Sequence, residues 1–494
     1  MTKTLQTRTG SYVDSVTLMQ ISKQVGSLPG VQAALVAMAT DLNLELAGGM
    51  GFDVPADVTS HHLLVAVEAD SDDAVSAALA EVDTALVQAS RPAGGTGFGS
   101  APEPVTVRAA ARSGEASVAL ISTPGQFAFA DAVDAVDAGL LTMVFSDNVP
   151  LEQEVALKEY ADRAGVLVMG PDCGTAVVGG VGLGFANVVR PGPVGIVAAS
   201  GTGAQHLMSL LDGVGVGVAH CLGVGGRDLS HEVGGRSTLR ALDLLDADAA
   251  TELLVVVSKP PAPEVAELVR GHAKELRTPV LFCLLGPGEP DLTAAAQRVC
   301  STVGAAWSAP EHWSGAVAAG RPGGALRGLF AGGTLCKESM LIASERVGAV
   351  ASNVPLEPDW ALGDDLGSRG HTMIDFGDDR LTLGRPHPMI DGSIRAERLL
   401  REIEDPGAGV LLLDVVLGLG AAPDPAGELA EPVRRATAAG LPVVVSVVGT
   451  RDDPQGTRAQ AALLNDAGAA VYLSNAASTR AALDLLDAPT GGNA

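Results

Sequence analysis

The chain has 494 residues, of which 47% are hydrophobic and 18% charged, and its formal net charge at pH 7 is −26. Such an acidic surface repels the phosphate backbone of nucleic acids, so we expect no nucleic-acid partner. No apolar run reaches the ~18 residues that a membrane-spanning helix needs, and the first ten residues contain no apolar signal core, so we expect a cytoplasmic protein without a membrane partner.

Residues 1–90 are predicted to form a small α/β unit of the ferredoxin-like or ACT-like kind. Three strands and one amphipathic helix are expected in it, over 12–21, 31–38, 62–68 and 72–88. Residues 91–104 are rich in glycine and proline, which indicates a linker.

The next unit, residues 105–190, alternates predicted strands and helices as a doubly wound parallel sheet does. Its strands are expected over 117–122, 141–146 and 166–169, and its helices over 129–139 and 151–164. Ligands bind such sheets at the carboxyl ends of the strands. The candidates for substrate or CoA binding in those loops are Pro124, Asn148, Asp172 and Cys173. A nucleophilic thiol is one interpretation of Cys173, but small buried cysteines are commoner.

Two similar strand-to-helix turns follow, one in each of the units 191–320 and 321–494. The first turn consists of Ser200, Gly201, Thr202 and Gly203, and the second of Gly332, Gly333 and Thr334. Each turn predicts a helix N-terminus, whose unpaired N–H groups and dipole would bind phosphate. The alternative is that serine and threonine only cap their helices.

The segments downstream of the two turns also match each other. Residues 253–286 and 410–449 both contain a strand, a proline-containing loop, a helix and a second strand, in that order. Isolated glycine-rich turns are common, so the matched order is stronger evidence than the turns themselves. The sequence therefore predicts a duplicated α/β domain.

These segments closely resemble FdrA proteins. The resemblance is carried by GIVAASGTGAQ (195–205), GGTLCKES (332–339) and IDFGDDRLTLGRPHPMID (374–391), with further matches over 170–188, 222–235 and 256–261. FdrA proteins are similar to succinyl-CoA synthetase. The resemblance therefore implies an α/β protein in which a Rossmann-like CoA-binding-type domain follows the N-terminal unit. Two flavodoxin-like ligase domains, of the α-subunit and β-subunit types, complete the chain.

The chain departs from succinyl-CoA synthetase at the relay. That enzyme phosphorylates a histidine in a Gly-His-Ala-Gly loop, but the matching residues 284–289 here are LLGPGE. The glutamate that orients the histidine falls at Ser258 and Lys259. The sequence also lacks the Gly-rich first turn of the CoA domain, an ATP-grasp domain and a GxxxxGK[ST] loop. We therefore do not expect ATP-driven ligation by this chain alone.

Some FdrA relatives are implicated in oxamate carbamoyltransferase activity as one subunit among several. The resemblance thus implies a small carbamoyl or acyl substrate and an oligomeric complex of several subunits. The implied reaction is phosphorolysis of oxalurate to oxamate and carbamoyl phosphate in ureide breakdown, after which a separate carbamate kinase, a candidate partner, can form ATP. Phosphate is the expected ligand, CoA an alternative one, and no metal is expected, since the five cysteines show no CxxC spacing. An acyl-CoA synthetase with its nucleotide step on a partner chain and a non-catalytic regulatory protein are the rival interpretations.

Five further residues are candidates for the chemistry. The guanidinium of Arg227, beside Asp228, would hold a substrate carboxylate through two parallel hydrogen bonds, unless the two residues form a surface pair. Lys259 places a positive charge where the related enzyme has glutamate, or is a solvated loop lysine. His387, between two prolines and near Arg385, is the best histidine candidate for acid–base work, with a structural turn as its alternative.

Overall fold

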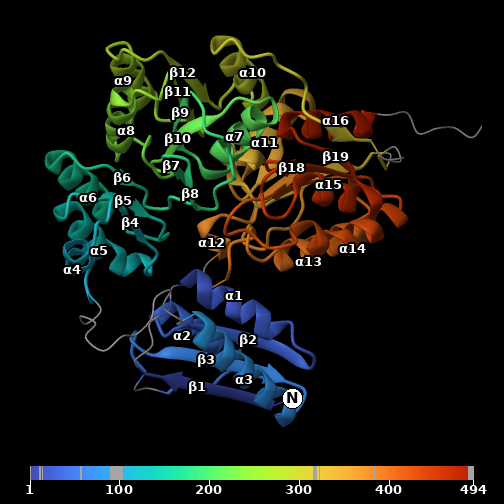
Figure 1. The fold of residues 1–494 in the computed structure, drawn as a ribbon. Helices are drawn as coiled ribbons and strands as arrows, with labels where there is room; N and C mark the ends of the chain where they lie inside the picture. The colour runs from blue at the N-terminus through green and yellow to red at the C-terminus, as the bar shows by residue number, and fades with distance from the viewer. Residues whose placement is uncertain are drawn as a thin grey trace, which may run out of the picture.

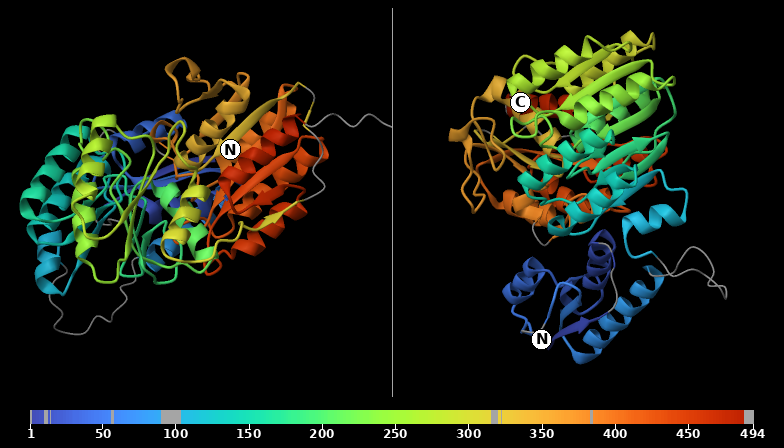
Figure 2. Two further views of the ribbon diagram at one scale, coloured as in Figure 1. Left: turned by 90° about the horizontal axis from the view of Figure 1, so that it is seen from above. Right: turned by 90° about the vertical axis from the view of Figure 1, so that its left-hand side faces the viewer.

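The structure is a computed structural model that describes residues 2–9, 13, 15–55, 58–89, 104–314, 320–321, 323–382 and 385–487. The expected linker therefore lies outside the described residues, except for Pro104, and so does Tyr12. Figure 1 shows a small N-terminal unit, a small parallel sheet and two larger α/β units, and Figure 2 shows them from two further directions. Among the described residues, no helix has both the length and the apolar character needed to cross a bilayer.

The N-terminal unit contains an antiparallel sheet in the order β1-β3-β2. Its elements are β1 (Thr2–Arg8), α1 (Ser15–Gly26), β2 (Val31–Met38), α2 (Asp41–Gly49), β3 (Leu63–Ala69) and α3 (Asp72–Ala89). The core residues of α1 and α3 pack on one face of the sheet, and those of α2 pack on the other. This α/β arrangement is of the expected kind.

The strand predicted over 12–21 is wrong, because helix α1 occupies this segment from Ser15 onwards. Leu18, Ile21 and Val25 are buried at a spacing that places them on one face of a helix. The β-branched residues of the segment suggested a strand, but packing against the sheet decides the conformation. Strand β1 was missed because its sequence, TKTLQTR, has one large apolar residue.

The second unit has a parallel sheet in the order β4-β5-β6, as expected. Its elements are α4 (Val107–Ser113), β4 (Val118–Ile121), α5 (Gly125–Asp137), β5 (Leu141–Val144), α6 (Leu151–Ala164) and β6 (Val168–Met169). Helix α5 begins at Gly125 and not at residue 129. The hairpin β7 (Thr175–Val178) and β8 (Val181–Gly184) pairs with the sheet of the next unit, so the boundary expected at 190 does not coincide with the change of sheet.

The two larger units repeat one topology, which confirms the duplication. The first sheet contains the order β12-β11-β9-β10 and the second the order β18-β17-β14-β16. Numbered by their order in the chain, the four strands quoted for each sheet run 4-3-1-2, the flavodoxin-like arrangement, and the ligand-binding switch point lies between the first and third of them. In the second sheet a further short strand, β15 (Val350–Ser352), lies outside β16.

The first large unit consists of β9 (Val194–Ala199), α7 (Gly201–Gly213), β10 (Val218–Gly223), α8 (Arg236–Ala247), β11 (Leu253–Ser258), α9 (Pro263–Ala273), β12 (Val280–Leu284) and α10 (Leu292–Thr302). The second consists of β14 (Ala325–Phe330), α11 (Gly333–Val347), β15 (Val350–Ser352), the 3₁₀ turn Pro358–Trp360, β16 (His371–Asp375), α12 (Asp379–Thr382), α13 (Ser393–Glu404), β17 (Ala408–Val416), α14 (Pro425–Ala438), β18 (Val443–Val448), α15 (Thr457–Asp466), β19 (Ala470–Tyr472) and α16 (Asn475–Asp487). Strand β13 (His312–Trp313), expected in the first unit, pairs with β19 of the second.

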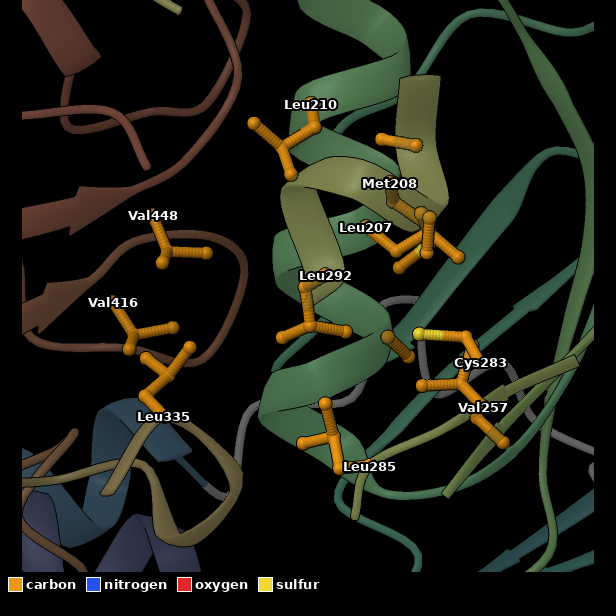
Figure 3. Close-up of a cluster of buried hydrophobic side chains, with 14 of the residues drawn as sticks. Leu207, Met208, Leu210, Val257, Cys283, Leu285, Leu292, Leu335, Val416 and Val448 are labelled. Atoms are coloured by element: carbon orange, nitrogen blue, oxygen red, sulfur yellow. The ribbon is translucent and has the colours of Figure 1, made fainter. Parts of the chain in front are cut away.

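The two large units share one hydrophobic core. Helices α7 and α11 lie side by side where the sheets meet. Figure 3 shows Leu207 and Leu210 on α7, which lies between the strands of the first unit and the side chains of Leu335, Val416 and Val448 of the second. All five side chains are at most 5% exposed and belong to one cluster. This packing fixes the two helices relative to each other, and with them the two predicted helix N-termini.

Candidate active site

A cavity of about 540 Å³ lies where the four parts of the chain meet. Its walls are the carboxyl ends of parallel strands, where doubly wound sheets bind ligands. The residues that reach it from these ends are Thr123 after β4, Asp147 after β5, Asp172 after β6, Ser200 after β9, Lys259 after β11, Gly333 after β14 and Asp375 at the end of β16. The N-terminal unit contributes Met19, Thr40 and Asn43.

The two predicted helix N-termini meet in this cavity. Ser200 Oγ, before α7, lies 2.6 Å from Thr334 Oγ1 in the first turn of α11. Ser200 Oγ also accepts a hydrogen bond from the N–H of Gly203 at 3.0 Å. Both side chains are buried, and both residues line the cavity. Their contact joins the two helices, and Ser200 also caps α7. Gly203 permits the approach, because a Cβ there would lie 2.9 Å from Thr334 Cγ2.

The backbone N–H groups of the first helical turns remain available to a ligand. Among the described residues, none of the N–H groups of Gly201, Thr202, Gly333, Thr334 and Leu335 has a hydrogen-bond partner. The positive ends of two helix dipoles meet at the same place. Gly332 is a correction to the predicted phosphate site, because its N–H donates to Asp414 Oδ2 at 2.8 Å.

Lys259 and Asp375 lie beside the first turn of α11. Lys259 Nζ is 3.6 Å from the position that a Cβ on Gly333 would occupy, and it forms no ion pair with a described residue. Asp375 is 5% exposed, and its Oδ1 accepts from the N–H of Gly377 at 2.9 Å. Burial raises the pKa of Asp375 to about 7, and the charge of Lys259 opposes that rise.

Asp375 was not predicted as a site residue. The sequence contains a signal for Asp375, because the acidic stretch IDFGDDR begins at the end of a buried strand. In a parallel sheet that position is a ligand-binding edge.

Three further carboxylates line the cavity: Asp147, Asp172 and Asp379. Asp172 is exposed to the cavity but closely surrounded by protein, so its carboxylate is poorly hydrated. This loss of hydration, together with the negative charges of Asp379 and Asp147, raises the pKa of Asp172 to about 7. Asp172 and Asn148 have left-handed backbones, with φ of 56° and 53°. Such conformations are uncommon outside glycine and concentrate at ligand sites.

Pro124 and Cys173 also line the cavity, as expected for a substrate wall. Pro124 is the N-cap residue of α5, which has no side-chain cap. Cys173 is 2% exposed and its thiol donates to the carbonyl of Thr175 at 3.6 Å. Burial raises the pKa of Cys173 to about 12, so the thiol stays protonated and a nucleophilic role is not supported.

Arg227 and Asp228 belong to a charge network beside the cavity, in which Asp228 is buried and the side chain of Arg227 is 43% exposed. The Nε of Arg227 pairs with Glu154 Oε2 at 2.8 Å, and its second nitrogen donates to the carbonyl of Val149 at 2.8 Å. Asp228 is fully buried and accepts from Lys158 and from the backbone of α8 at Thr238. Neither residue is part of the cavity wall. Asp228 is saturated by hydrogen bonds, which corrects its predicted role, whereas the role of Arg227 as a substrate ligand stays a prediction.

Arg385 and His387 both line the cavity. The side chain of Arg385 has no ion pair or hydrogen bond within the described part of the chain. His387 Nδ1 accepts from the N–H of Met389 at 3.2 Å, so the neutral ring carries its proton on Nε2. Burial, followed by the charge of Arg395, lowers the pKa of His387 to about 4. The ring therefore is a neutral hydrogen-bond donor at pH 7.

No group of three or more His, Cys, Asp or Glu side chains in the described ranges is arranged to hold a metal ion. The N-terminal 102 residues contain no cysteine.

The sequence matches two families and several curated proteins. The CoA-ligase family matches residues 329–485, and the family described as AllF, heavy metal-associated domain, matches residues 1–102. The chain is 36% identical to the uncharacterized protein YahF of Escherichia coli strain K12, over 93% of each chain. It is 27% identical to the ADP-forming succinate–CoA ligase subunit alpha 2 of Archaeoglobus fulgidus, over 40% of this chain and 68% of that subunit.

A solved structure of the dinucleotide forming acetyl-coenzyme A synthetase 1 of Ca. Korarchaeum cryptofilum, in complex with phosphate and ADP, is 18% identical. It covers 75% of this chain and 82% of that one, with a TM-score of 0.28, too low for the two chains to superpose as wholes. The likeness to YahF extends over nearly the whole chain. Together with the CoA-ligase and AllF matches, it shows that the chain belongs to the family of YahF, a family of FdrA/AllF-like proteins related to succinyl-CoA synthetase.

Proposed function

We propose that this chain is a subunit of a complex that cleaves a carbamoylated substrate with phosphate and releases carbamoyl phosphate without ATP. The contact between Ser200 Oγ and Thr334 Oγ1, 2.6 Å apart, carries the proposal, because it brings two helix N-termini to one cavity. A phosphate there would accept hydrogen bonds from Gly201 and Thr202 on one helix and from Gly333 on the other. The ammonium of Lys259 would add a charge-assisted hydrogen bond.

With oxalurate as substrate, one phosphate oxygen forms a bond to the terminal carbamoyl carbon. The bond from that carbon to the oxamate nitrogen breaks, and its electron pair stays on nitrogen. The nitrogen takes the proton that the phosphate brought, so HPO₄²⁻ and oxalurate give oxamate and carbamoyl phosphate. Nε2–H of His387 and the guanidinium of Arg385 are the cavity donors available to the substrate carboxylate and to the developing oxyanion.

The side chains on the cavity support direct attack by phosphate over a phosphohistidine. Lys259 stands where the related enzyme has the orienting glutamate, and its positive charge favours phosphate. Residues 284–289 contain no histidine. In His387, the Nδ1 lone pair is used by Met389 and Nε2 is protonated, so neither nitrogen is free to attack phosphorus.

Acyl-CoA formation with the nucleotide step on a partner chain is the second candidate. The match to the CoA-ligase family over 329–485 favours it. The uncapped start of α5 at Pro124 also opens into the same cavity, where it could receive a CoA phosphate.

The two candidates are separated by reconstituting the chain with the subunits that co-purify from its native host. Oxalurate and phosphate should then give carbamoyl phosphate, measured as ATP after addition of carbamate kinase and ADP. Lys259→Ala should lower turnover roughly tenfold to a hundredfold, the value of a charge-assisted hydrogen bond. Lys274→Ala, at the exposed end of α9, is the matched control and should have no effect. A complex that makes no carbamoyl phosphate, but forms acyl-CoA from a carboxylate, CoA and ATP, would establish the second candidate.

A further inference from the structure

Asp375 is a buried acid with one oxygen facing the cavity. It is the last residue of β16 and is 5% exposed. Oδ1 is held by the N–H of Gly377, whereas Oδ2 has no hydrogen-bond partner among the described residues. Oδ2 lies against Gly333, the first residue of α11, so closely that a Cβ at Gly333 would collide with it. Its free oxygen is therefore aimed at the turn proposed to hold phosphate.

Charged and titratable groups surround Asp375 on several elements. They are Lys259 after β11, Cys336 and Lys337 on α11, Asp378 in the loop after β16, Asp414 on β17, and His387. The Nε2 of His387 and the Oδ1 of Asp375 both lie against Gly377. Lys259 and Lys337 favour the carboxylate, and Asp378 and Asp414 favour the protonated acid. The cysteine and histidine are neutral at pH 7 because burial raises the pKa of the first and lowers that of the second.

These opposing influences leave Asp375 able to exist in either form at neutral pH, where burial has raised its pKa to about 7. A dianion bound at the first turn of α11 would add two negative charges beside Oδ2. Like charges at this distance favour the protonated acid, so an incoming phosphate should bring a proton onto Asp375. The acid could then donate a hydrogen bond into the cavity.

We propose that Asp375 is a catalytic residue: it binds a proton when a tetrahedral dianion enters the cavity and passes it to the leaving nitrogen of the substrate. The inference rests on the proposed function. As the carbon–nitrogen bond breaks, the electron pair on nitrogen takes the proton from Asp375, and the phosphate gives its own proton to the resulting carboxylate. No other reactant is consumed: Asp375 is protonated at the start and at the end of this chemical step. The proton that it took up when the dianion bound is released when the product leaves.

The other carboxylates of the site are less suited to this role. Asp414 is tied up by Arg395 at 2.5 Å and by the N–H groups of Ala331 and Gly332. The Oδ2 of Asp172 lies 3.6 Å from the position of a Cβ on Gly226, whereas that of Asp375 lies against Gly333 of α11. Asp172 is nevertheless the right comparison, because its pKa is also raised to about 7.

Titration calorimetry with sulfate on the full chain tests the inference. Sulfate has the shape and charge of the phosphate dianion but does not titrate near neutral pH, so any proton exchanged belongs to the protein. Binding measured in buffers of different ionisation enthalpy should show uptake approaching about one proton at about pH 8, where free Asp375 is mostly ionised. Uptake should fall towards zero at about pH 6, where Asp375 already carries its proton.

Two isosteric variants assign the proton. Asp375→Asn should abolish most of the uptake at pH 8 and leave sulfate affinity unchanged or tighter, because a negative charge is removed. Asp172→Asn should keep the uptake. In the reconstituted complex, Asp375→Asn should lower kcat at least tenfold without raising KM for phosphate.

The outcomes separate this inference from the proposed function. Sulfate that binds without proton uptake, or with the same uptake in Asp375→Asn, overturns the role of Asp375 and leaves the anion site intact. Loss of sulfate binding in Asp375→Asn also overturns it, because the acid would then be needed to hold the anion. A wild-type chain that binds neither sulfate nor phosphate overturns the proposed function itself.

Discussion

At the scale of single residues, the number of hydrogen bonds that a buried carboxylate accepts distinguishes a structural acid from one that can bind a ligand. Asp228 accepts from Lys158, Ser237 and Thr238 and is fully buried, so no lone pair is left for a ligand. Asp375 keeps one oxygen free beside α11. Asp228 was a predicted site residue because it stands beside Arg227, and Asp375 was not predicted. The network that saturates Asp228 joins residues about 70 positions apart, which no local pattern reveals.

The buried network predicts a large effect of Lys158→Met on stability. Lys158 pairs with Glu154 at 2.9 Å and with Asp228 at 2.8 Å, and all three side chains are at most 1% exposed. Removing the lysine leaves two buried carboxylates, of which Glu154 still pairs with the partly exposed Arg227, whereas Asp228 has no other ion pair with a described residue. We expect the free energy of unfolding to fall by about 3–5 kcal/mol, measured by chemical denaturation. Lys274→Met, at an exposed position, should change it by less than about 0.5 kcal/mol, and an equally small change in Lys158→Met would contradict the network.

At the scale of elements, the two helix N-termini were predictable, but the way they meet was not. Small residues after a buried strand indicate the start of a helix, and both α7 and α11 begin within such turns. Their mutual contact depends on how two sheets pack, since 134 residues separate Ser200 from Thr334. The hydroxyls that looked like phosphate ligands are used in that contact.

The contact predicts that Gly203 and Gly213, at opposite ends of α7, respond differently to alanine. A Cβ at Gly203 would meet Thr334 Cγ2 at 2.9 Å, whereas a Cβ at Gly213 meets nothing within 4 Å. Gly203→Ala should destabilise the chain by about 1–3 kcal/mol through overpacking and should weaken its stabilisation by phosphate. Gly213→Ala should be neutral or stabilising by up to about 1 kcal/mol. Melting curves with and without phosphate measure both effects, and equal behaviour of the two variants would disprove a tight helix contact.

At the scale of the whole molecule, the order of the units and the duplication were predictable, because strand and helix patterns recur along the chain. The strand order β18-β17-β14-β16 follows from the same pattern that gives β12-β11-β9-β10. The edges of the two large sheets differ from the predicted division into units. The hairpin β7-β8 and strand β13 each pair with the sheet of a neighbouring unit. Short edge strands carry too few residues for periodicity to show which sheet they join.

The placement of the N-terminal unit could not be predicted from its sequence. Lys23 on α1 donates to the carbonyl of Ile390 at 2.9 Å and pairs with Glu428 on α14. This contact lies near Met19, Thr40 and Asn43, which close one side of the cavity. The cavity is therefore completed by all four units, and the proposed chemistry belongs to the chain as a whole.

A crystal structure of the full chain soaked with selenate tests the central claim most directly, because selenium gives an anomalous signal and selenate has the shape and charge of phosphate. The account predicts the strongest non-protein anomalous peak inside the cavity. Its oxygens should lie ~2.7–3.2 Å from backbone nitrogens of Gly201 or Thr202, from that of Gly333 and from Lys259 Nζ. Selenate bound elsewhere at the surface, with an empty cavity between α7 and α11, would contradict it.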